Sequence, residues 1–378
     1  MALRPVVRDQ ACRTRRPIAT STNPQMNIPT EPIGSIPRPP ELIAAIAAGA
    51  SEAQLAPLYQ EAVAATVAAM EATGSPVISD GEQAKVEDFW SYPVHGAANI
   101  AQDGFPLPLS DQHPRRMPRL TRGPFRYERY ADAYLRAAYR HASAPVKQAV
   151  ISPSALSLMY PPEGLPGYPR EQFLDDLLRE HETEVRRCLE AGAHKVQVDF
   201  TEGLLAMRLD PSGALLASFV DLNNMALGRF SAQERALIGV HTCPGSHHAD
   251  PAGGAPDYAE LLPTLFELKA GNFYVPLAGV PDPERTLRII GQYARPGQRI
   301  FVGVTNPADP RIETPEQVRE RVLHAARFIA PAQLGTTDDC GFAPFCDERS
   351  VSRETAFAKI RARVEGTRLA AARLEEQA

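Results

Sequence analysis

The chain of 378 residues has few cysteines, little net charge and no long apolar run. Its five cysteines are sparse and odd in number, so we expect a reducing compartment, the cytoplasm by default, with metal-bound or free thiols instead of disulfides. No apolar stretch approaches the length of a transmembrane helix. A formal net charge of −5 argues against nucleic acid as a partner. The remaining composition is that of an ordinary soluble globular protein.

The first 25 residues differ from the rest in charge. They contain five arginines and one acid, Asp9, and they lack the apolar core of a secretory signal. An Arg-rich, acid-poor leader fits a transit peptide, a disordered extension, or an upstream start ahead of a true start at Met26. We therefore leave residues 1–25 out of the fold and treat residues 26–378 as one domain.

From Met26 onward, short β-type runs alternate with helical patterns. Strands are expected at residues 28–35, 76–80, 146–152, 195–199, 237–243, 272–278, 299–304 and 333–340. Helices are expected at residues 51–74, 170–191, 256–269, 283–293 and 352–375, and after a capping box at residues 314–317.

Eight such units predict an α/β fold, a single (β/α)8 TIM barrel with a long insertion between the second and third strands. A doubly wound sheet is the alternative. That fold would require a glycine-rich dinucleotide-binding loop after the first strand, and Gly34-Ser-Ile-Pro-Arg-Pro39 is not such a loop.

His241-Thr-Cys243 and the later Asp339-Cys340-Gly341 are the patterns that best indicate chemistry. One neutral imidazole and two thiolates suit Zn²⁺, and three protein ligands leave a fourth position for a substrate. A substrate thiol there would lose its proton to the metal yet stay nucleophilic, which favours a sulfur-alkylating enzyme. The alternative is a core histidine beside a buried thiol.

The predicted barrel brings further polar residues to the same rim. His241, Cys243 and Cys340 lie at or just after the ends of the fifth and eighth strands. Four more polar residues, Ser35, Asp80, Glu82 and Asp199, follow the first, second and fourth strands. Because the active sites of such barrels lie at the carboxyl ends of the strands, this grouping favours an active site over core packing.

Five motifs in this order resemble the catalytic barrel of cobalamin-independent methionine synthases. They are residues 33–39 (IGSIPRP), 79–82 (SDGE), 196–199 (VQVD), 241–243 (HTC) and 339–341 (DCG). The resemblance covers residues 27–375. It points to the short, single-barrel branch, which also includes the epoxyalkane:coenzyme M transferases.

The resemblance implies roles for individual residues. His241, Cys243 and Cys340 would hold zinc. Ser35 and the backbone around Ile33 would bind the carboxylate of an amino-acid thiol. Glu82 and Asp199 would bind its ammonium group and contribute to catalysis, as paired carboxylates suit a cation. The other interpretations are an exposed loop acid for Glu82 and a helix N-cap for Asp199.

Two departures from the family pattern concern the metal and the donor. Leu277 stands about where the synthases have a glutamate that also binds zinc. The segment after the seventh strand reads Thr305-Asn306-Pro307-Ala308, without the Asp-x-His that assists proton transfer linked to folate. The sequence therefore supports zinc and thiol chemistry more strongly than a folate donor.

Four arginines at positions 115, 116, 119 and 122 lie in the long segment between the second and third strands. Arg116 and Arg119 are candidates for binding an anionic part of a substrate. The alternative is that these arginines pair with nearby surface acids. Glu202, just after the fourth strand, is either a general base or metal ligand, or an ordinary loop acid.

Together these observations predict a zinc-dependent methyltransferase of methionine biosynthesis. It would move a methyl group, with a methylated folate as one candidate donor, to the thiol of homocysteine or a related thiol. One alternative is alkyl transfer to another thiol, as in epoxyalkane:coenzyme M transferase. A second is a zinc-free barrel that binds a carboxylated ligand. The expected partners are small molecules, and the oligomeric state is left open.

Overall fold

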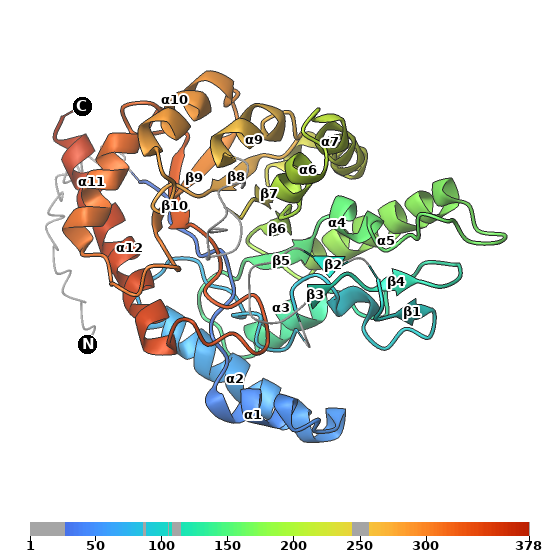
Figure 1. The fold of residues 1–378 in the computed structure, drawn as a ribbon. Helices are drawn as coiled ribbons and strands as arrows, with labels where there is room; N and C mark the ends of the chain where they lie inside the picture. Colours follow the sequence, from blue (N-terminus) through green and yellow to red (C-terminus); the bar gives the residue numbers. More distant parts are fainter. Residues whose placement is uncertain (1–26, 86–87, 105, 108–114, 244–256, 378) are drawn as a thin grey trace, which may run out of the picture.

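A computed structural model describes residues 27–85, 88–104, 106–107, 115–243 and 257–377 (Figure 1). The predictions for residues 1–25 lie outside this part of the chain. The described residues form an α/β fold, with strands in the centre and helices around them.

Six parallel strands form the central sheet, in the order β10-β9-β8-β7-β6-β5. They are β5 (Gln148–Ile151), β6 (Val196–Asp199), β7 (Ile238–His241), β8 (Asn272–Val275), β9 (Arg299–Thr305) and β10 (Leu334–Asp338). These strands confirm the last six of the eight predicted from the sequence. Strands that are neighbours in the sheet are also neighbours in the chain, so each pair is joined by a helical crossover.

The prediction of strands at residues 28–35 and 76–80 is wrong in its extent. Each segment forms only an isolated parallel bridge, Thr30 with Thr336 in β10 and Ile78 with Val146 just before β5. Prolines at positions 29 and 32 supply no backbone N–H and interrupt a ladder along residues 28–35, whereas Pro76 removes only the donor at the start of residues 76–80. The two segments nevertheless lie at the two ends of the six-stranded sheet.

Helices cover the outside of the sheet (Figure 1). Those that follow the six strands are α4 (Pro153–Ser157), α5 (Arg170–Glu190), α6 (Gly203–Leu209), α7 (Ala214–Leu227), α8 (Ala232–Arg235), α9 (Tyr258–Leu265), α10 (Pro283–Tyr293), α11 (Pro315–Ala325) and α12 (Arg353–Glu375). α1 (Pro40–Ala47) and α2 (Glu52–Glu71) precede them. Capping boxes begin α2 at Ser51 and α11 at Thr314, so the sequence signals for these helix starts are confirmed.

Between the Ile78 bridge and β5 the chain forms small elements instead of a barrel unit. β1 (Ile100–Ala101) pairs with β4 (Arg119–Leu120), and β2 (Pro106–Leu107) pairs with β3 (Arg115–Arg116), both antiparallel. A short 3-10 helix η1 (Tyr92–Val94) and α3 (Asp132–Tyr139) complete this region.

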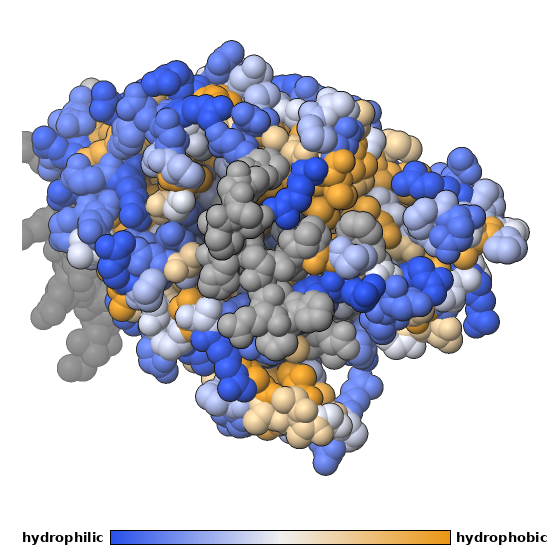
Figure 2. Space-filling view, in the orientation of Figure 1, coloured by the Kyte–Doolittle hydropathy of each residue, from blue (hydrophilic) through white to orange (hydrophobic). Residues whose placement is uncertain are grey.

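The main core lies between the sheet and the helices. Nearly every residue of β5 to β10 is buried, as expected for a parallel sheet covered on both faces. The face drawn in Figure 2 is mostly hydrophilic over α10 to α12, because these helices turn their apolar side to the sheet. None of the helices among the described residues has the length and apolar character that crossing a bilayer requires.

Candidate active site

The candidate site residues come from the carboxyl ends of the parallel strands. Asp199 ends β6, His241 ends β7, and the two are aligned in the register of the sheet. Cys243 and Cys340 each follow two residues after the end of a strand, β7 and β10. Because the strands are parallel, all these side chains lie at one edge of the sheet.

His241, Cys243 and Cys340 lie together, as the sequence predicted. The two Sγ atoms are 2.9 Å apart, and Cys340 Sγ lies 3.8 Å from His241 Nε2. Burial lowers the pKa of His241 to about 3, so the imidazole is neutral. The hydrogen bond with Cys243, together with burial, raises the pKa of the Cys340 thiol.

The donor atoms are chemically suited to zinc, although they are not spaced as metal ligands. Within the described part of the chain, no group of three His, Cys, Asp or Glu side chains has the geometry of a metal site. A tetrahedral zinc holds two sulfurs about 3.8 Å apart, and a sulfur and a nitrogen about 3.6 Å apart. The distance from Cys340 to His241 fits this geometry, whereas the sulfurs would have to separate by about 0.9 Å.

Asp338 and Asp339, which precede Cys340, hold the backbone of the site. Asp339 accepts hydrogen bonds from the backbone N–H groups of Leu277, Ala278 and Gly279 at 2.8, 2.9 and 2.6 Å. It therefore ties the loop after β8 to the end of β10. Asp338 accepts a 2.7 Å bond from the Thr305 hydroxyl. Leu277, which stands about where the synthases have a glutamate, is a buried apolar side chain.

Glu82 lies in a strained loop, and it is buried instead of exposed. Its φ of 57° is the only positive φ of a non-glycine residue among those described. Such a backbone costs free energy and persists only where its surroundings enforce it. Asp80 accepts a 3.0 Å bond from Glu82 N, and Arg38 donates to the carbonyls of Glu82, Gln83 and Lys85. Arg38 is 6% exposed and acts as a buried clamp on this loop.

The structure also brings a lysine to the predicted carboxylate pair. Lys85 Nζ lies 3.5 Å from Glu82 Oε2 and donates to the carbonyl of Ala149 over 3.2 Å. Burial opposes its charge, but Glu82, Asp199 and Asp80 outweigh this effect and raise the pKa of Lys85. Sequence analysis missed this residue. The only indication of its role in the sequence is its position three residues after Glu82.

The Asp199 carboxylate interacts electrostatically with both the lysine and a thiol of the site. Burial, and then the charge of Glu82, raise its pKa to about 7, while Lys85 opposes the rise. The charge of Asp199 also contributes to the raised pKa of Cys340. Each effect requires proximity, so the predicted ammonium-binding pair and the predicted metal ligands belong to one site.

Ser35 adjoins the loop that carries Cys340. Its carbonyl accepts a 2.9 Å bond from Phe342 N, and its hydroxyl accepts a 3.2 Å bond from Ala343 N. A Cβ on Gly341 would lie 2.0 Å from Ser35 Oγ, so only glycine permits this approach. The Ile33 side chain packs on Tyr274 and Phe301. Its backbone therefore runs beside the inner surface of the sheet.

Glu202 is a buried acid just after β6. One carboxylate oxygen accepts from the hydroxyls of Ser152, at 2.7 Å, and Ser154. Burial raises the pKa of Glu202 to about 7. Its side-chain bonds thus go to two serines and not to the predicted metal ligands.

The two candidate arginines have other partners. Arg119 forms a bidentate ion pair with Asp103, at 3.0 and 2.9 Å, and Arg116 donates to the Gly104 carbonyl at 3.0 Å. The ion pair between Arg119 and Asp103 is exposed, as in the alternative interpretation of this cluster. Their neighbours at residues 108–114 lie outside the described part.

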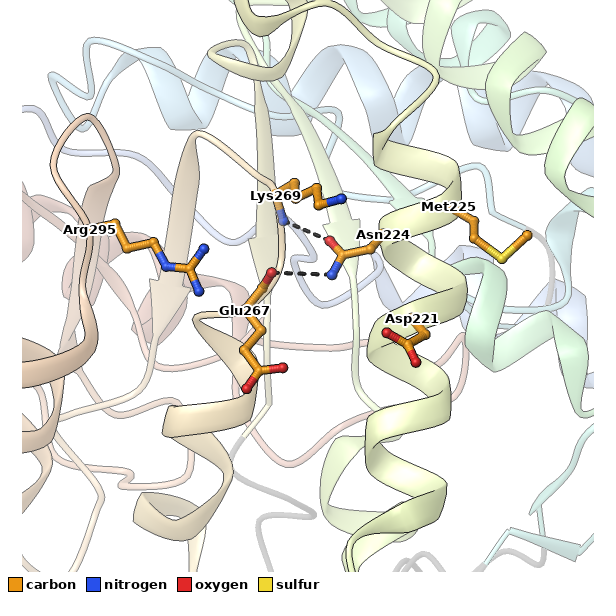
Figure 3. Close-up of a pocket in the computed structure, with 6 residues that line it drawn as sticks. All are labelled: Asp221, Asn224, Met225, Glu267, Lys269 and Arg295. Atoms are coloured by element: carbon orange, nitrogen blue, oxygen red, sulfur yellow. Dashed lines mark hydrogen bonds between the residues drawn. The ribbon is translucent and has the colours of Figure 1, made fainter.

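A surface depression of about 710 Å³ lies far from this edge (Figure 3). Its walls come from α7 and from segments that precede β8 and β9, so it lies toward the amino ends of the strands. It is lined by Asp221, Asn224, Met225, Glu267, Lys269 and Arg295. These residues hold no cluster of catalytic or metal-binding groups, and the depression is separate from the candidate site.

Comparison with known proteins finds partial similarity to methionine synthases. No family model matches it. It is 25% identical over 215 residues to the uncharacterized protein YxjH of Bacillus subtilis, covering 51% of this chain and 52% of that protein. It is also 25% identical over 202 residues to a methionine synthase of Saccharolobus islandicus, covering 53% and 51%. The chain spans about half the length of these curated relatives.

Solved structures share the fold over most of the chain. A B12-independent methionine synthase from Shewanella sp. W3-18-1, in complex with selenomethionine, has a TM-score of 0.72 at 17% identity and covers 92% of this chain and 99% of that one. A putative vitamin-B12-independent methionine synthase from Listeria monocytogenes has a TM-score of 0.63 at 19% identity, covering 89% and 96%. The expected resemblance to cobalamin-independent methionine synthases is confirmed in sequence and in fold.

Proposed function

We propose that this chain is a zinc-dependent methyltransferase that methylates the thiol of homocysteine or a related thiol, with a methylated folate as one candidate donor. The observation that carries the proposal is the grouping of His241, Cys243 and Cys340, with a 2.9 Å sulfur–sulfur and a 3.8 Å sulfur–nitrogen distance. The similarity to methionine synthases supports a methyltransferase.

His241, Cys243 and Cys340 are the residues that we propose to hold zinc. Zinc, when bound, lowers the pKa of a substrate thiol, so that the sulfur is a nucleophile at neutral pH. The neutral imidazole of His241 presents a lone pair without first losing a proton. Asp339, the residue before Cys340, ties the loop after β8 to the end of β10 and so restrains the backbone next to this ligand.

The acceptor's amino-acid part is proposed to bind beside the thiols. Asp199 and Glu82 would hold the ammonium group, and Ser35 with the backbone at Ile33 would bind the carboxylate. Burial supports this role, because a buried carboxylate interacts strongly with a cation that reaches it. Glu82 and Asp199 thus orient the acceptor sulfur for in-line attack on the methyl carbon.

The binding site of the methyl donor is a separate part of the proposal. We propose Arg116 and Arg119 as binding residues for an anionic part of the donor, which would replace Asp103 or the Gly104 carbonyl as their partner. We further propose that residues 26–378 form one closed barrel in the cytoplasm. Its closure is supported by bonds from Ile36 N to Gly81 O, at 3.0 Å, and from Ser79 Oγ to Gly34 O, at 2.7 Å.

Metal analysis of the purified protein tests the zinc site. We expect close to one zinc per chain in the wild type and a large loss in Cys243→Ser and in Cys340→Ser. Cys188→Ala is the matched control, since Cys188 is a buried thiol within α5, outside the site. Zinc far below one per chain, unchanged by the two serine substitutions, would refute the transferase and favour a zinc-free barrel for a carboxylated ligand.

A thiol screen on zinc-loaded protein tests the substrates. Homocysteine with a methyl-folate should lose free thiol and form methionine. Coenzyme M with small epoxides tests the alternative transferase. Turnover with an epoxide but with no methyl donor would overturn the proposed reaction and support that alternative.

A further inference from the structure

A row of buried polar side chains runs along the inside of the sheet and ends at Asp199. Lys147 Nζ donates to Gln197 Oε1 over 2.7 Å, and Gln197 Nε2 donates to Asp199 Oδ1 over 2.8 Å. Lys147 is 1% exposed and Gln197 is 0% exposed. A lysine that never reaches solvent is thus linked through one amide to the carboxylate proposed to bind the acceptor.

Strand geometry places these three residues on one surface. Gln197 and Asp199 are two residues apart on β6, so they point to the same face of the sheet. Ala149 of β5 lies opposite Gln197 in the register, and Lys147 precedes Ala149 by two residues. The row therefore follows from the alternation of side chains along two neighbouring strands.

The amide of Gln197 has one orientation that satisfies both neighbours. An ammonium group only donates hydrogen bonds, and an ionised carboxylate only accepts them. Lys147 therefore takes the amide oxygen, which turns the amide NH₂ group toward Asp199. Without Lys147, the amide oxygen loses its donor, and only the bond to Asp199 holds the Gln197 side chain in place.

The position of Lys147 is itself held from the other side. Its Nζ lies 3.8 Å from the centre of the Tyr274 ring, and the Tyr274 hydroxyl donates to Glu31 Oε2 over 2.6 Å. Burial lowers the pKa of Lys147 to about 7, and the nearby charge of Glu31 opposes this loss of the proton. The aromatic face and the amide together leave the lysine little freedom.

We propose that Lys147 is a positioning residue for the acceptor, which acts through Gln197 to orient the Asp199 carboxylate. The bond from Gln197 engages Oδ1 and leaves Oδ2 for the ammonium group of the acceptor. This inference rests on the proposed function, because an acceptor with an ammonium group is part of it. The link from Lys147 to Asp199 can nevertheless be tested without any substrate.

The first test measures the link by unfolding the protein in urea. Lys147→Met, Asp199→Asn and their double variant are compared in the wild-type background and again with Gln197→Met. In the wild-type background, the unfolding equilibrium constant of the double variant should differ about tenfold, or about 1.4 kcal/mol, from the value that the two single effects together predict. In the Gln197→Met background, this difference should fall below about threefold. Additive effects in the wild-type background would overturn the inference.

The second test measures how the link is used, with L-homocysteine as the acceptor. Lys147→Met and Gln197→Met should each raise KM about tenfold and change kcat less than about twofold, since they disturb binding and not the reacting groups. Their double variant should be no worse than either single one. Lys359→Met is the control, because Lys359 is equally buried and bonds to Glu313 at 2.8 Å, away from this row.

The outcomes separate the inference from the proposed function. A wild type that does not use homocysteine refutes the proposed acceptor, and the unfolding comparison then decides alone whether Lys147 acts on Asp199. If the wild type is active and the homocysteine KM is unchanged in Lys147→Met, or rises equally in Lys359→Met, the positioning role is refuted.

Discussion

Replacing Lys85 by methionine is the most direct test of the charges in the site. Lys85 is 1% exposed, and its Nζ lies 3.5 Å from Glu82 Oε2. Methionine has a similar length and volume but no charge, so Lys85→Met removes the cation and leaves the packing nearly intact. The carboxylates of Glu82, Asp80 and Asp199 then remain in a buried site without it.

The expected loss of stability follows from the geometry. Two unit charges 3.5 Å apart attract each other by about 5 kcal/mol at an effective dielectric constant of 20. Removing one partner of a buried pair destabilises a protein by about 3–5 kcal/mol. The bond to the Ala149 carbonyl is lost as well. We therefore expect the free energy of unfolding to fall by about 3–5 kcal/mol at pH 8.

The loss should depend on pH because of the two aspartates. Burial raises the pKa of Asp80 to about 6 and that of Asp199 to about 7, above the unfolded value of about 3.9, and Lys85 opposes both shifts. Each aspartate therefore contributes stability that is complete below about pH 4 and is lost as the pH rises through the folded pKa. Without Lys85 the pKa values of both aspartates in the folded protein rise further, so stability continues to fall up to a higher pH.

Urea unfolding at pH 5 and pH 8 measures this difference. The cost of Lys85→Met should be larger at pH 8 than at pH 5 by at least about 1 kcal/mol, close to one unit of pKa shift. Lys359→Met is the matched control, since its partner Glu313 lies away from both aspartates, and its cost should not grow in this way. A cost of Lys85→Met that stays constant, or that is larger at pH 5, would refute the charge assignment.

Substitutions at three further positions test the loops around the site. Because φ of residue 82 is 57°, Glu82→Gly should be more stable than Glu82→Ala by about 0.5–1 kcal/mol in urea unfolding, and equal stabilities would contradict the left-handed backbone. Arg38→Met should lower the free energy of unfolding by about 1–3 kcal/mol and raise the homocysteine KM, because three loop carbonyls lose a buried donor. An unchanged KM would argue against Arg38 as a clamp on the loop. Gly341→Ala should weaken acceptor binding while zinc content is retained, since the new Cβ would lie 2.0 Å from Ser35 Oγ, and unaltered binding would exclude Ser35 from the acceptor site.

The central strands were predictable because their sequence pattern is unambiguous. Residues 299–304 are mostly apolar, residues 146–152 hold three β-branched residues, and both segments become strands. The segments at 28–35 and 76–80 contain similar residues, but prolines remove backbone donors at positions 29, 32 and 76. Apolar content alone therefore overestimated how much of the sheet is hydrogen bonded.

The metal-ligand candidates were predictable because each follows directly after a strand. The rule that parallel strands bring their carboxyl ends together placed His241, Cys243 and Cys340 correctly without any knowledge of side-chain directions. Lys85 could not be found in this way. Its direction depends on the unusual φ of Glu82 and on Arg38, which lies 44 to 47 residues before the three carbonyls that it bonds.

The partners of the arginine cluster could not be predicted from the sequence either. Both a substrate clamp and surface ion pairs agree with the spacing of Arg116 and Arg119, since local patterns do not show which acids fold close to them. In the structure the antiparallel pairing of β1 with β4 brings Arg119 near Asp103. Pairings between small strands of two residues carry almost no sequence signal.

The charge balance of the site bears on which thiol it accepts. Lys85 is one ammonium group that interacts with three carboxylates, those of Glu82, Asp199 and Asp80. Burial is the main cause of the raised pKa values of both aspartates, and the charge of Glu82 adds to it while Lys85 opposes it, so negative charge is costly in this site. An amino-acid thiol brings a second ammonium group and relieves the imbalance. The sulfonate of coenzyme M would add a negative charge in the same place, at a cost that grows with burial. Between the two proposed acceptors, the electrostatics of these four residues therefore favour the amino-acid thiol.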